Sequence, residues 1–183
     1  MRLAEQGIEE LRKVVDAIII VPNDRLLTAI SKETTAKAAF AMCDEVLRQV
    51  VEGISDIITT AGVINCDFAD IRAILENAGS ALIGIGSATG EKRAEEAAKL
   101  AINSPLQDLS ITGAKGVLFS IAGGDDLGML EINDAAKIIT ETIDPNAKVI
   151  FGFIKDEKLK KGEVKITVIA SGFPDSNLKA KPL

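Results

Sequence analysis

Residues 34–60, TTAKAAFAMCDEVLRQVVEGISDIITT, form the longest helical pattern in this chain of 183 residues. Their apolar side chains recur at spacings of three and four, the period of an α-helix. These positions are Ala36, Ala39, Phe40, Cys43, Val46, Leu47, Val50, Ile54, Ile57 and Ile58. At 1.5 Å per residue, roughly 25 residues span about 37 Å, longer than an ordinary surface helix. Because the apolar positions cover more than one stripe, we expect this helix to lie buried between two bodies of structure.

The segments after this helix alternate between helical and strand patterns. They predict helices over residues 67–78, 91–102 and 131–143, and strands over residues 81–85, 116–121, 148–154 and 164–170. In the last strand, Val164, Ile166 and Val168 alternate with Lys165 and Thr167, which predicts that one face of this strand meets solvent. Four strands with helices on one face make a compact α/β or α+β domain.

Residues 1–33 are organised differently. A helix expected over residues 3–15 precedes AIIIV at residues 17–21, a β-branched run typical of a strand that is covered on both faces in a parallel sheet. One helix and one strand cannot bury their own apolar surface, so we expect this strand to lack its sheet partners. Residues 174–183 are predicted to form a polar tail without a core of its own.

The composition excludes several classes of protein. Hydrophobic residues make up 47% of the chain but aromatic residues only 3%, so aliphatic side chains must fill the core. The absence of histidine rules out histidine-based catalytic triads and zinc–histidine sites. A net charge of −6 and the lack of a Lys/Arg block argue against nucleic acid as a partner.

Membrane insertion and secretion are not expected either. The longest dense apolar run, residues 17–21, falls far short of the roughly 20 residues that a membrane-spanning helix needs. No basic start is followed by an apolar stretch and a small-residue cleavage site. The two cysteines, Cys43 and Cys66, are far apart in sequence and fit a reducing compartment. We therefore expect a cytoplasmic protein.

The motif NCDFAD, residues 65–70, is the first candidate for chemistry. Asp67 and Asp70 stand three positions apart at the expected start of a helix, so their carboxylates can face the same way. The commonest role of such a pair is helix capping, with Asp67 as the N-cap and Asp70 favoured by the helix dipole. Alternatively, the two carboxylates polarise a water molecule or hold a cation, which suits phosphoanhydride hydrolysis. The residues by themselves leave both roles open.

Three weaker candidates have simpler structural interpretations. The glycine-rich GIGSATG, residues 84–90, is interpreted as a tight strand-to-helix turn rather than a phosphate-binding loop. GGDD, residues 123–126, is interpreted as a turn, because its spacing does not fit a calcium loop. Phe40 is interpreted as a core residue, although Phe40 and Asp44, one helical turn apart, could also stack on a guanine and accept its N–H groups.

Six segments of the chain, taken in order, resemble the FtsZ family of tubulin-like GTPases of prokaryotic cell division. They are VPNDRLL (21–27), AFAMCDEVL (39–47), EGISDIIT (52–59), AGVINCDFADIRAIL (61–75), ALIGIGSATGEKRAEEAAKLAINSPL (81–106) and GAKGVLFSIAGGDDL (113–127). The resemblance covers essentially residues 3–173 and implies a tubulin/FtsZ-like α/β fold. It implies a remnant of the Rossmann-like GTP-binding lobe in residues 1–33, the central helix in 34–60 and the C-terminal activation domain in 61–173.

The resemblance also implies roles for the candidate residues. Asp67 and Asp70 would polarise the water that attacks the GTP of the neighbouring subunit, and Asn65 would help to place that water. Asn23, Phe40 and Asp44 match positions that contact guanine. GTP or GDP is the expected ligand, with Mg²⁺ in the intact protein and no metal site assigned to this chain.

The partners implied by the resemblance are copies of the protein itself, arranged head to tail in a filament, and other cell division proteins. The expected location is the cytoplasm at the division site. The family's glycine-rich phosphate loop, GGGTG followed by T or S and then G, is absent from the sequence. We therefore expect this chain to be inactive without the missing N-terminal GTP-binding half. The alternative is a non-enzymatic fragment that docks on filaments and caps them.

Overall fold

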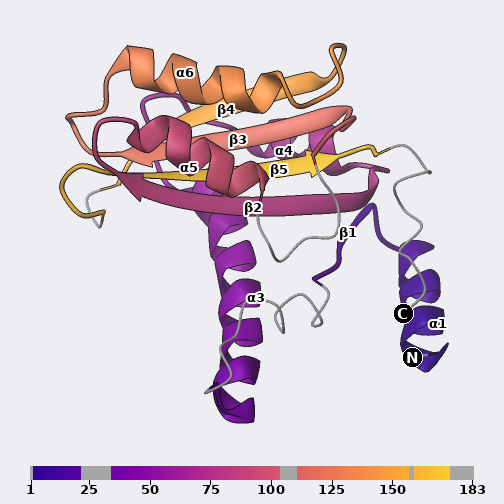
Figure 1. Cartoon of the computed structure of the whole chain (residues 1–183). Coiled ribbons are helices and arrows are strands. Elements are labelled where there is room, and N and C mark those ends of the chain that lie inside the picture. The colour runs from indigo at the N-terminus through magenta and orange to yellow at the C-terminus, as the bar shows by residue number, and fades with distance from the viewer. Residues whose placement is uncertain (1, 22–33, 104–110, 157–158, 174–183) are drawn as a thin grey trace.

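The computed structural model describes residues 2–21, 34–103, 111–156 and 159–173 (Figure 1). The helices are α1 (Arg2–Arg12), α3 (Ala36–Thr59), α4 (Phe68–Leu75), α5 (Arg93–Ile102) and α6 (Met129–Thr140). The strands are β1 (Ala17–Ile19), β2 (Gly79–Thr89), β3 (Gly116–Gly123), β4 (Lys148–Lys155) and β5 (Glu163–Ser171). They form one mixed sheet in the order β1-β2-β5-β3-β4. β1 is parallel to β2 and β3 to β4, whereas β5 is antiparallel to both of its neighbours.

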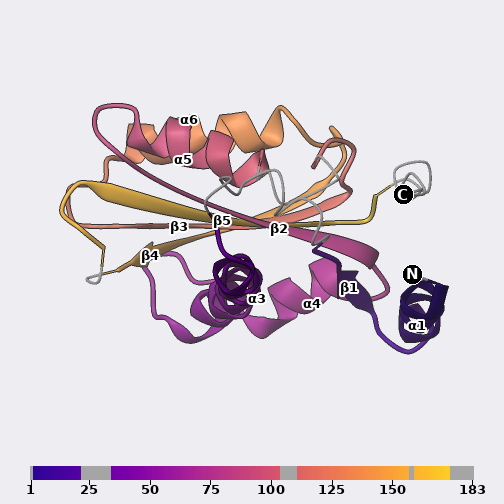
Figure 2. The same ribbon diagram turned by 60° about the horizontal axis from the view of Figure 1, so that its bottom comes forward.

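Helices α5 and α6 cover one face of the sheet (Figure 2). The alanine-rich side of α5 approaches β2 closely, because Gly84 and Gly86 have no side chain there. A Cβ atom at Gly84 would lie 1.8 Å from the carbonyl oxygen of Ala101. As the composition predicts, aliphatic side chains dominate the core on this face, among them Leu82, Val117, Ile121, Ile139, Val164, Ile166 and Val168.

Helix α4 and the C-terminal part of α3 cover the opposite face, so the expectation of helices on one face only is wrong (Figure 2). Their core comprises Ile57, Cys66, Ile71, Ile74, Ile83, Leu118 and Ile169. The expectation of a half-solvated β5 is wrong for the same reason. Thr167, Ile169 and Ser171 point toward α3 and α4 and are buried. The hydroxyl of Ser171 donates to the carbonyl of Ile74 over 2.6 Å, which allows a polar side chain to be buried.

The expectation that residues 17–21 would lack sheet partners is also wrong. β1 pairs with the first residues of β2, in the register Ala17 with Gly79 and Ile19 with Ala81. The amide of Gly79 donates to the carbonyl of Asp16 over 2.9 Å, and the Asp16 carboxylate accepts from the amide of Asn77. The strand is shorter than the apolar run predicts, since only Ala17, Ile18 and Ile19 pair with β2.

Helix α3 begins at an N-cap, Thr35, whose hydroxyl accepts from the amide of Ala38 over 3.2 Å. Its C-terminal half packs on the sheet where Gly53 lies against Thr167, and a Cβ atom at Gly53 would be 3.1 Å from a methyl group of that threonine. Its N-terminal half projects away from the sheet (Figure 1). Phe40 is 67% exposed and Leu47 is 56% exposed there. The sequence predicted that this helix would lie between two bodies of structure. The described residues contain one of them, the sheet on which the C-terminal half of α3 packs.

The two glycine-rich motifs have different outcomes. GIGSATG is not a turn: residues 84–89 continue strand β2, and the chain turns at Gly90, whose φ of 102° favours glycine. The turn predicted at residues 123–126 is confirmed between β3 and α6. None of the helices in the described ranges is both long and apolar enough to cross a membrane.

Candidate functional site

The candidate site is the acid loop, defined here as residues 61–70, which comprise the connection from α3 to α4 and the first residues of α4. Its first part is fixed to the outer edge of β4. The amide of Val63 donates to the carbonyl of Phe153 over 2.8 Å, and the amide of Phe153 donates to the carbonyl of Ile64 over 2.9 Å. A Cβ atom at Gly62 would lie 2.2 Å from the Phe153 oxygen, so this close approach requires glycine. The loop is therefore held in place before its acidic residues begin.

Asp67 and Asp70 form the predicted cap at the start of α4. One carboxylate oxygen of Asp67 accepts from the amide of Asp70 over 2.9 Å, and one of Asp70 accepts from the amide of Asp67 over 3.2 Å. This reciprocal pair is a capping box. Each carboxylate uses only one oxygen in the box. The capping role is confirmed, and it leaves the second oxygen of each acid available for another group.

Asn65 is held by the turn that precedes these acids. Its side-chain oxygen accepts from the amide of Gly62 over 2.6 Å. Because the side-chain oxygen takes this bond, the side-chain NH₂ group of Asn65 points the other way, where it can act only as a hydrogen-bond donor. The structure thus brings the two acceptors Asp67 and Asp70 together and fixes Asn65, a possible donor, on the turn just before them.

Cys66 lies beneath the acids and is buried, with 7% of its surface exposed. Its sulfur packs against Gly152 of β4, where a Cβ atom would be only 3.0 Å away. Burial raises the pKa of the Cys66 thiol, and the carboxylates of Asp70 and Asp67 raise that pKa further. The thiol is therefore protonated at neutral pH, and its role is to anchor the loop to the core on this face.

Two large apolar side chains flank the acids without being buried. Val63 is 70% exposed and Phe68 is 66% exposed. Both project from the same loop that presents Asp67 and Asp70. Both side chains are therefore accessible to another molecule.

The candidate nucleotide contacts lie elsewhere. Phe40 and Asp44 are one helical turn apart on the projecting half of α3, and both are exposed, so the core interpretation of Phe40 is not supported by the described residues. Asn23 lies outside the described residues. About 20 residues of helix, or about 30 Å, separate Phe40 from the start of the acid loop. One nucleotide cannot reach both groups of residues on the same chain.

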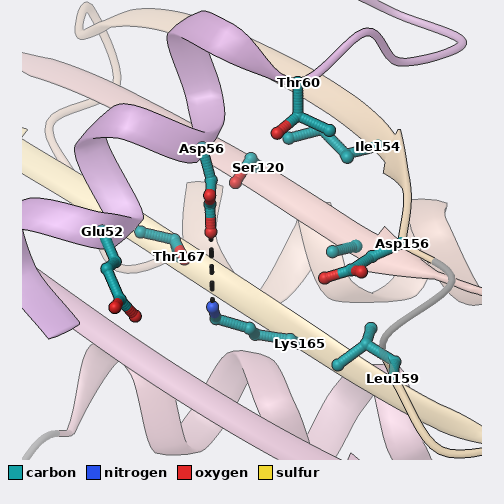
Figure 3. Close-up of a pocket in the computed structure, with 10 residues that line it drawn as sticks. Glu52, Asp56, Thr60, Ser120, Ile154, Asp156, Leu159, Lys165 and Thr167 are labelled. Carbon is teal, nitrogen blue, oxygen red and sulfur yellow. Dashed lines mark ion pairs between the residues drawn. The ribbon is translucent and has the colours of Figure 1, made fainter.

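Sequence reasoning missed a polar pocket between α3 and the sheet (Figure 3). Its volume is about 470 Å³, and its lining includes Glu52, Asp56, Ser120, Asp156, Lys165 and Thr167. The ammonium of Lys165 lies 3.8 Å from the Asp56 carboxylate and links β5 to α3. No local signal could have found this pocket, because its walls come from segments more than 100 residues apart in sequence.

The acids of the GGDD turn are neutralised by basic side chains. The buried guanidinium of Arg93 bonds the carboxylate of Asp126 over 2.6 Å and that of Glu131 over 2.8 Å, and Lys155 pairs with Asp125 over 2.8 Å. In the part of the chain that the structure describes, no group of three or more His, Cys, Asp or Glu residues is arranged to hold a metal ion.

Comparison with known proteins places this architecture among the FtsZ and tubulin-like proteins. Residues 79–174 match the FtsZ family, C-terminal domain. An empty FtsZ dimer from M. jannaschii matches with a TM-score of 0.82 and 39% identity over 91% of this chain and 48% of that one. A point mutant of FtsZ from M. jannaschii gives the same TM-score and identity over 92% and 50% of the two chains. The chain belongs to the FtsZ family.

A more distant structure shares the fold. CetZ2 from Haloferax volcanii, a protofilament with GTPγS bound, matches with a TM-score of 0.69 and 18% identity over 95% of this chain and 53% of that one. The chain thus spans about half the length of the solved structures that it matches.

Proposed function

We propose that this chain is the part of a filament-forming GTPase that activates GTP hydrolysis on the neighbouring subunit. The observation that carries the proposal is the acid loop. Its capping box holds Asp67 and Asp70 side by side, each with one carboxylate oxygen outside the box, on a loop flanked by exposed apolar side chains. Such a loop can act on a ligand that is bound to another molecule.

The chemistry follows from the three polar side chains. An ionised carboxylate only accepts hydrogen bonds, so Asp67 and Asp70 can orient a water molecule by accepting its protons. The amide nitrogen of Asn65 donates, and it can hold the same water or a phosphate oxygen. Positioning of the attacking water and stabilisation of charge provide most of the catalysis of phosphoryl transfer.

Nucleotide binding is assigned to the other end of α3. The exposed ring of Phe40 offers a stacking surface for guanine, and the Asp44 carboxylate can accept from the guanine N–H groups. Asn23 is proposed as a third contact. The sequence contains no glycine-rich phosphate loop, so we expect neither turnover by this chain alone nor retention of Mg²⁺, which accompanies the nucleotide phosphates.

The separation of the two groups along α3 supports assembly. If Phe40 and Asp44 hold one nucleotide and the acid loop serves another, copies must stack head to tail. The similar proteins include an FtsZ dimer and a CetZ2 protofilament. The proposed setting is Z-ring assembly in the cytoplasm at the division site, with other cell division proteins as partners.

A second candidate function is capping of filaments without turnover. The observation that favours it is the combination of an exposed acid loop and a missing phosphate loop. Such a chain could occupy one end of a filament and leave no nucleotide site for the next subunit.

The deciding experiment mixes this chain with intact FtsZ from M. jannaschii and measures phosphate release and sedimented polymer. We expect phosphate release to rise with wild-type chain and not with Asp70→Asn. The matched variant keeps a side-chain oxygen for the cap and loses the charge. A fall in both polymer and phosphate release would favour capping. Unchanged phosphate release and no co-sedimentation would contradict both functions.

A further inference from the structure

Strand β4 is an outer strand of the sheet, and its main chain alternates between two sides. The amide of Lys148 donates to the carbonyl of Lys115 over 2.8 Å, so even-numbered residues direct their main-chain groups toward β3. The amide and carbonyl of Phe153 bond the acid loop on the other side. Odd-numbered residues therefore direct their main-chain groups outward.

The acid loop pairs with only part of this outward row. Ile64 pairs with Phe153 in an isolated antiparallel bridge. The outward N–H and C=O groups of Val149 and Phe151 have no main-chain partner within the described ranges. These two residues form the open edge of the sheet.

The open edge lacks the features that usually protect an outer strand. Natural sheets protect their edges with charge, proline or bulges, because unpaired main-chain groups are a template for another strand. Between Lys148 and Lys155 the sequence is VIFGFI, without charge or proline. Val149 is 40% exposed and Phe151 is 39% exposed. The ring of Phe151 stacks on that of Phe119, its partner on β3, with 5.8 Å between ring centres.

The open edge is continuous with the acid loop. The loop runs antiparallel to β4, and Ile64 lies opposite Phe153, so the following residues advance toward Phe151 and Val149. Cys66 confirms this direction, because its sulfur lies against Gly152. Asp67 and Phe68 come next in the chain. The acid loop thus adjoins the open edge, because its paired residue Phe153 lies two positions along β4 from Phe151.

We propose that the open edge takes up an extended segment of the neighbouring FtsZ subunit as an added strand. The inference rests on the proposed function and extends it: main-chain hydrogen bonds at Val149 and Phe151 join the subunit contact beside the acid loop. Strand addition of this kind takes affinity from main-chain bonds and specificity from alternate side chains. The added segment places apolar side chains against Val149 and Phe151 and carries no positive charge next to Lys148.

The test uses Val149→Pro, with Val149→Thr as the matched control. Proline removes the outward N–H of residue 149 and places its ring on the edge, whereas that N–H takes no part in pairing with β3. Threonine keeps the N–H group and the branched shape. Co-sedimentation with assembled M. jannaschii FtsZ is measured over a range of chain concentrations. We expect about tenfold weaker binding for Val149→Pro and wild-type binding for Val149→Thr.

Circular dichroism melting establishes whether the proline variant folds. If it does not, Val149→Lys gives the same readout, because a charge on the edge opposes strand addition and is easily tolerated by the fold. Binding of the folded edge variant at wild-type strength would overturn the inference. If this chain forms dimers by itself and the edge variant abolishes them, the added strand comes from a second copy of this chain. That result would overturn the choice of partner. Failure of the wild-type chain to bind FtsZ at all would instead refute the proposed function.

Discussion

At the scale of single residues, the acid loop combines a structural role with the chemical role proposed for the same side chains. Asp67 and Asp70 cap α4 with one oxygen each, which fixes the direction of the other oxygen. Asn65 is fixed in the same way by the amide of Gly62. Pre-organisation of this kind is what a water-positioning site requires, because loosely held groups would lose catalytic power.

Arg93 is a second residue whose side chain makes several hydrogen bonds at once. It is 7% exposed, and it bonds Glu131 through two nitrogens and Asp126 through both the carboxylate and the main-chain oxygen. These bonds join the start of α5 to the turn before α6. Hydrogen bonds from Arg93 lower the pKa of Glu131 and of Asp126 below their ordinary values.

These pKa shifts predict acid sensitivity. The folded state binds protons at Glu131 and Asp126 less readily than the unfolded state does, because both pKa values are lowered on folding. Their contribution to stability is therefore complete above the ordinary pKa of about 4 and is lost as the pH falls through the folded values. We expect Arg93→Met to lower the melting temperature by several degrees at pH 7 and by less near pH 3.

The measurement is thermal unfolding of both chains between pH 7 and pH 3. Lys99→Met is a suitable control, since Lys99 pairs with Glu95 only on the surface at 3.8 Å. A difference between wild type and Arg93→Met that stays constant over this range would show that loss of packing, and not the ion pairs, causes the destabilisation.

At the scale of elements, β2 and α5 are in very close contact. A Cβ atom at Gly84 would lie 1.8 Å from the Ala101 oxygen, and one at Gly86 would lie 2.1 Å from the Ala97 oxygen. Both neighbours are main-chain atoms of α5 and cannot rotate away. The alanine-rich face of α5 and the glycines of β2 therefore depend on each other.

Gly84→Ala is expected to destabilise the chain by about 3 kcal/mol or more, because α5 would have to move away from the sheet. Gly7→Ala is the control, since no atom lies within 4 Å of its Cβ position. That change should be neutral or stabilising by up to about 1 kcal/mol, as alanine favours helix α1. Urea denaturation of both variants gives the comparison. Equal stability of Gly84→Ala and wild type would mean that α5 is not seated on β2 as described.

Periodicity was a reliable guide to the helices but not to every strand. The capped start of α4 was visible in the sequence, because Asp67 is a typical N-cap residue, whereas the Thr35 cap of α3 was found only in the structure. The glycines at 84 and 86 resembled a turn, although their purpose is close packing inside a strand. Thr167 and Ser171 resembled a solvated face, because no local pattern reveals that α3 and α4 cover β5.

At the scale of the whole molecule, the candidate site was predictable only in part. The acids and their cap lie within six residues of each other, so their mutual arrangement could be predicted from the sequence. The pocket containing Asp56 and Lys165 could not, because it depends on how α3 crosses the sheet. Likewise, the 30 Å or so between Phe40 and the acid loop follows from the length of α3, but its meaning depends on how copies assemble.

That separation predicts complementation between two inactive variants. Under the proposed function, each nucleotide site in a head-to-tail filament combines Phe40 and Asp44 of one subunit with the acid loop of the next, as heterologous contacts require. Asp44→Ala spoils the first part of the site and Asp70→Asn the second. When each variant is joined with a separately made N-terminal GTP-binding half, neither alone should release phosphate at a GTP concentration that the Asp44→Ala protein cannot bind.

An equal mixture of the two variants should recover about a quarter of wild-type phosphate release, since random head-to-tail order pairs an intact nucleotide pocket with an intact acid loop at one contact in four. Phosphate release is measured across mixing ratios, and a maximum at equal proportions is expected. Absence of recovery in mixtures that still sediment as polymers would mean that the acid loop does not act on a nucleotide held by another subunit. Asp70 would then lose its proposed role on the neighbouring subunit, because its effect would be confined to its own chain.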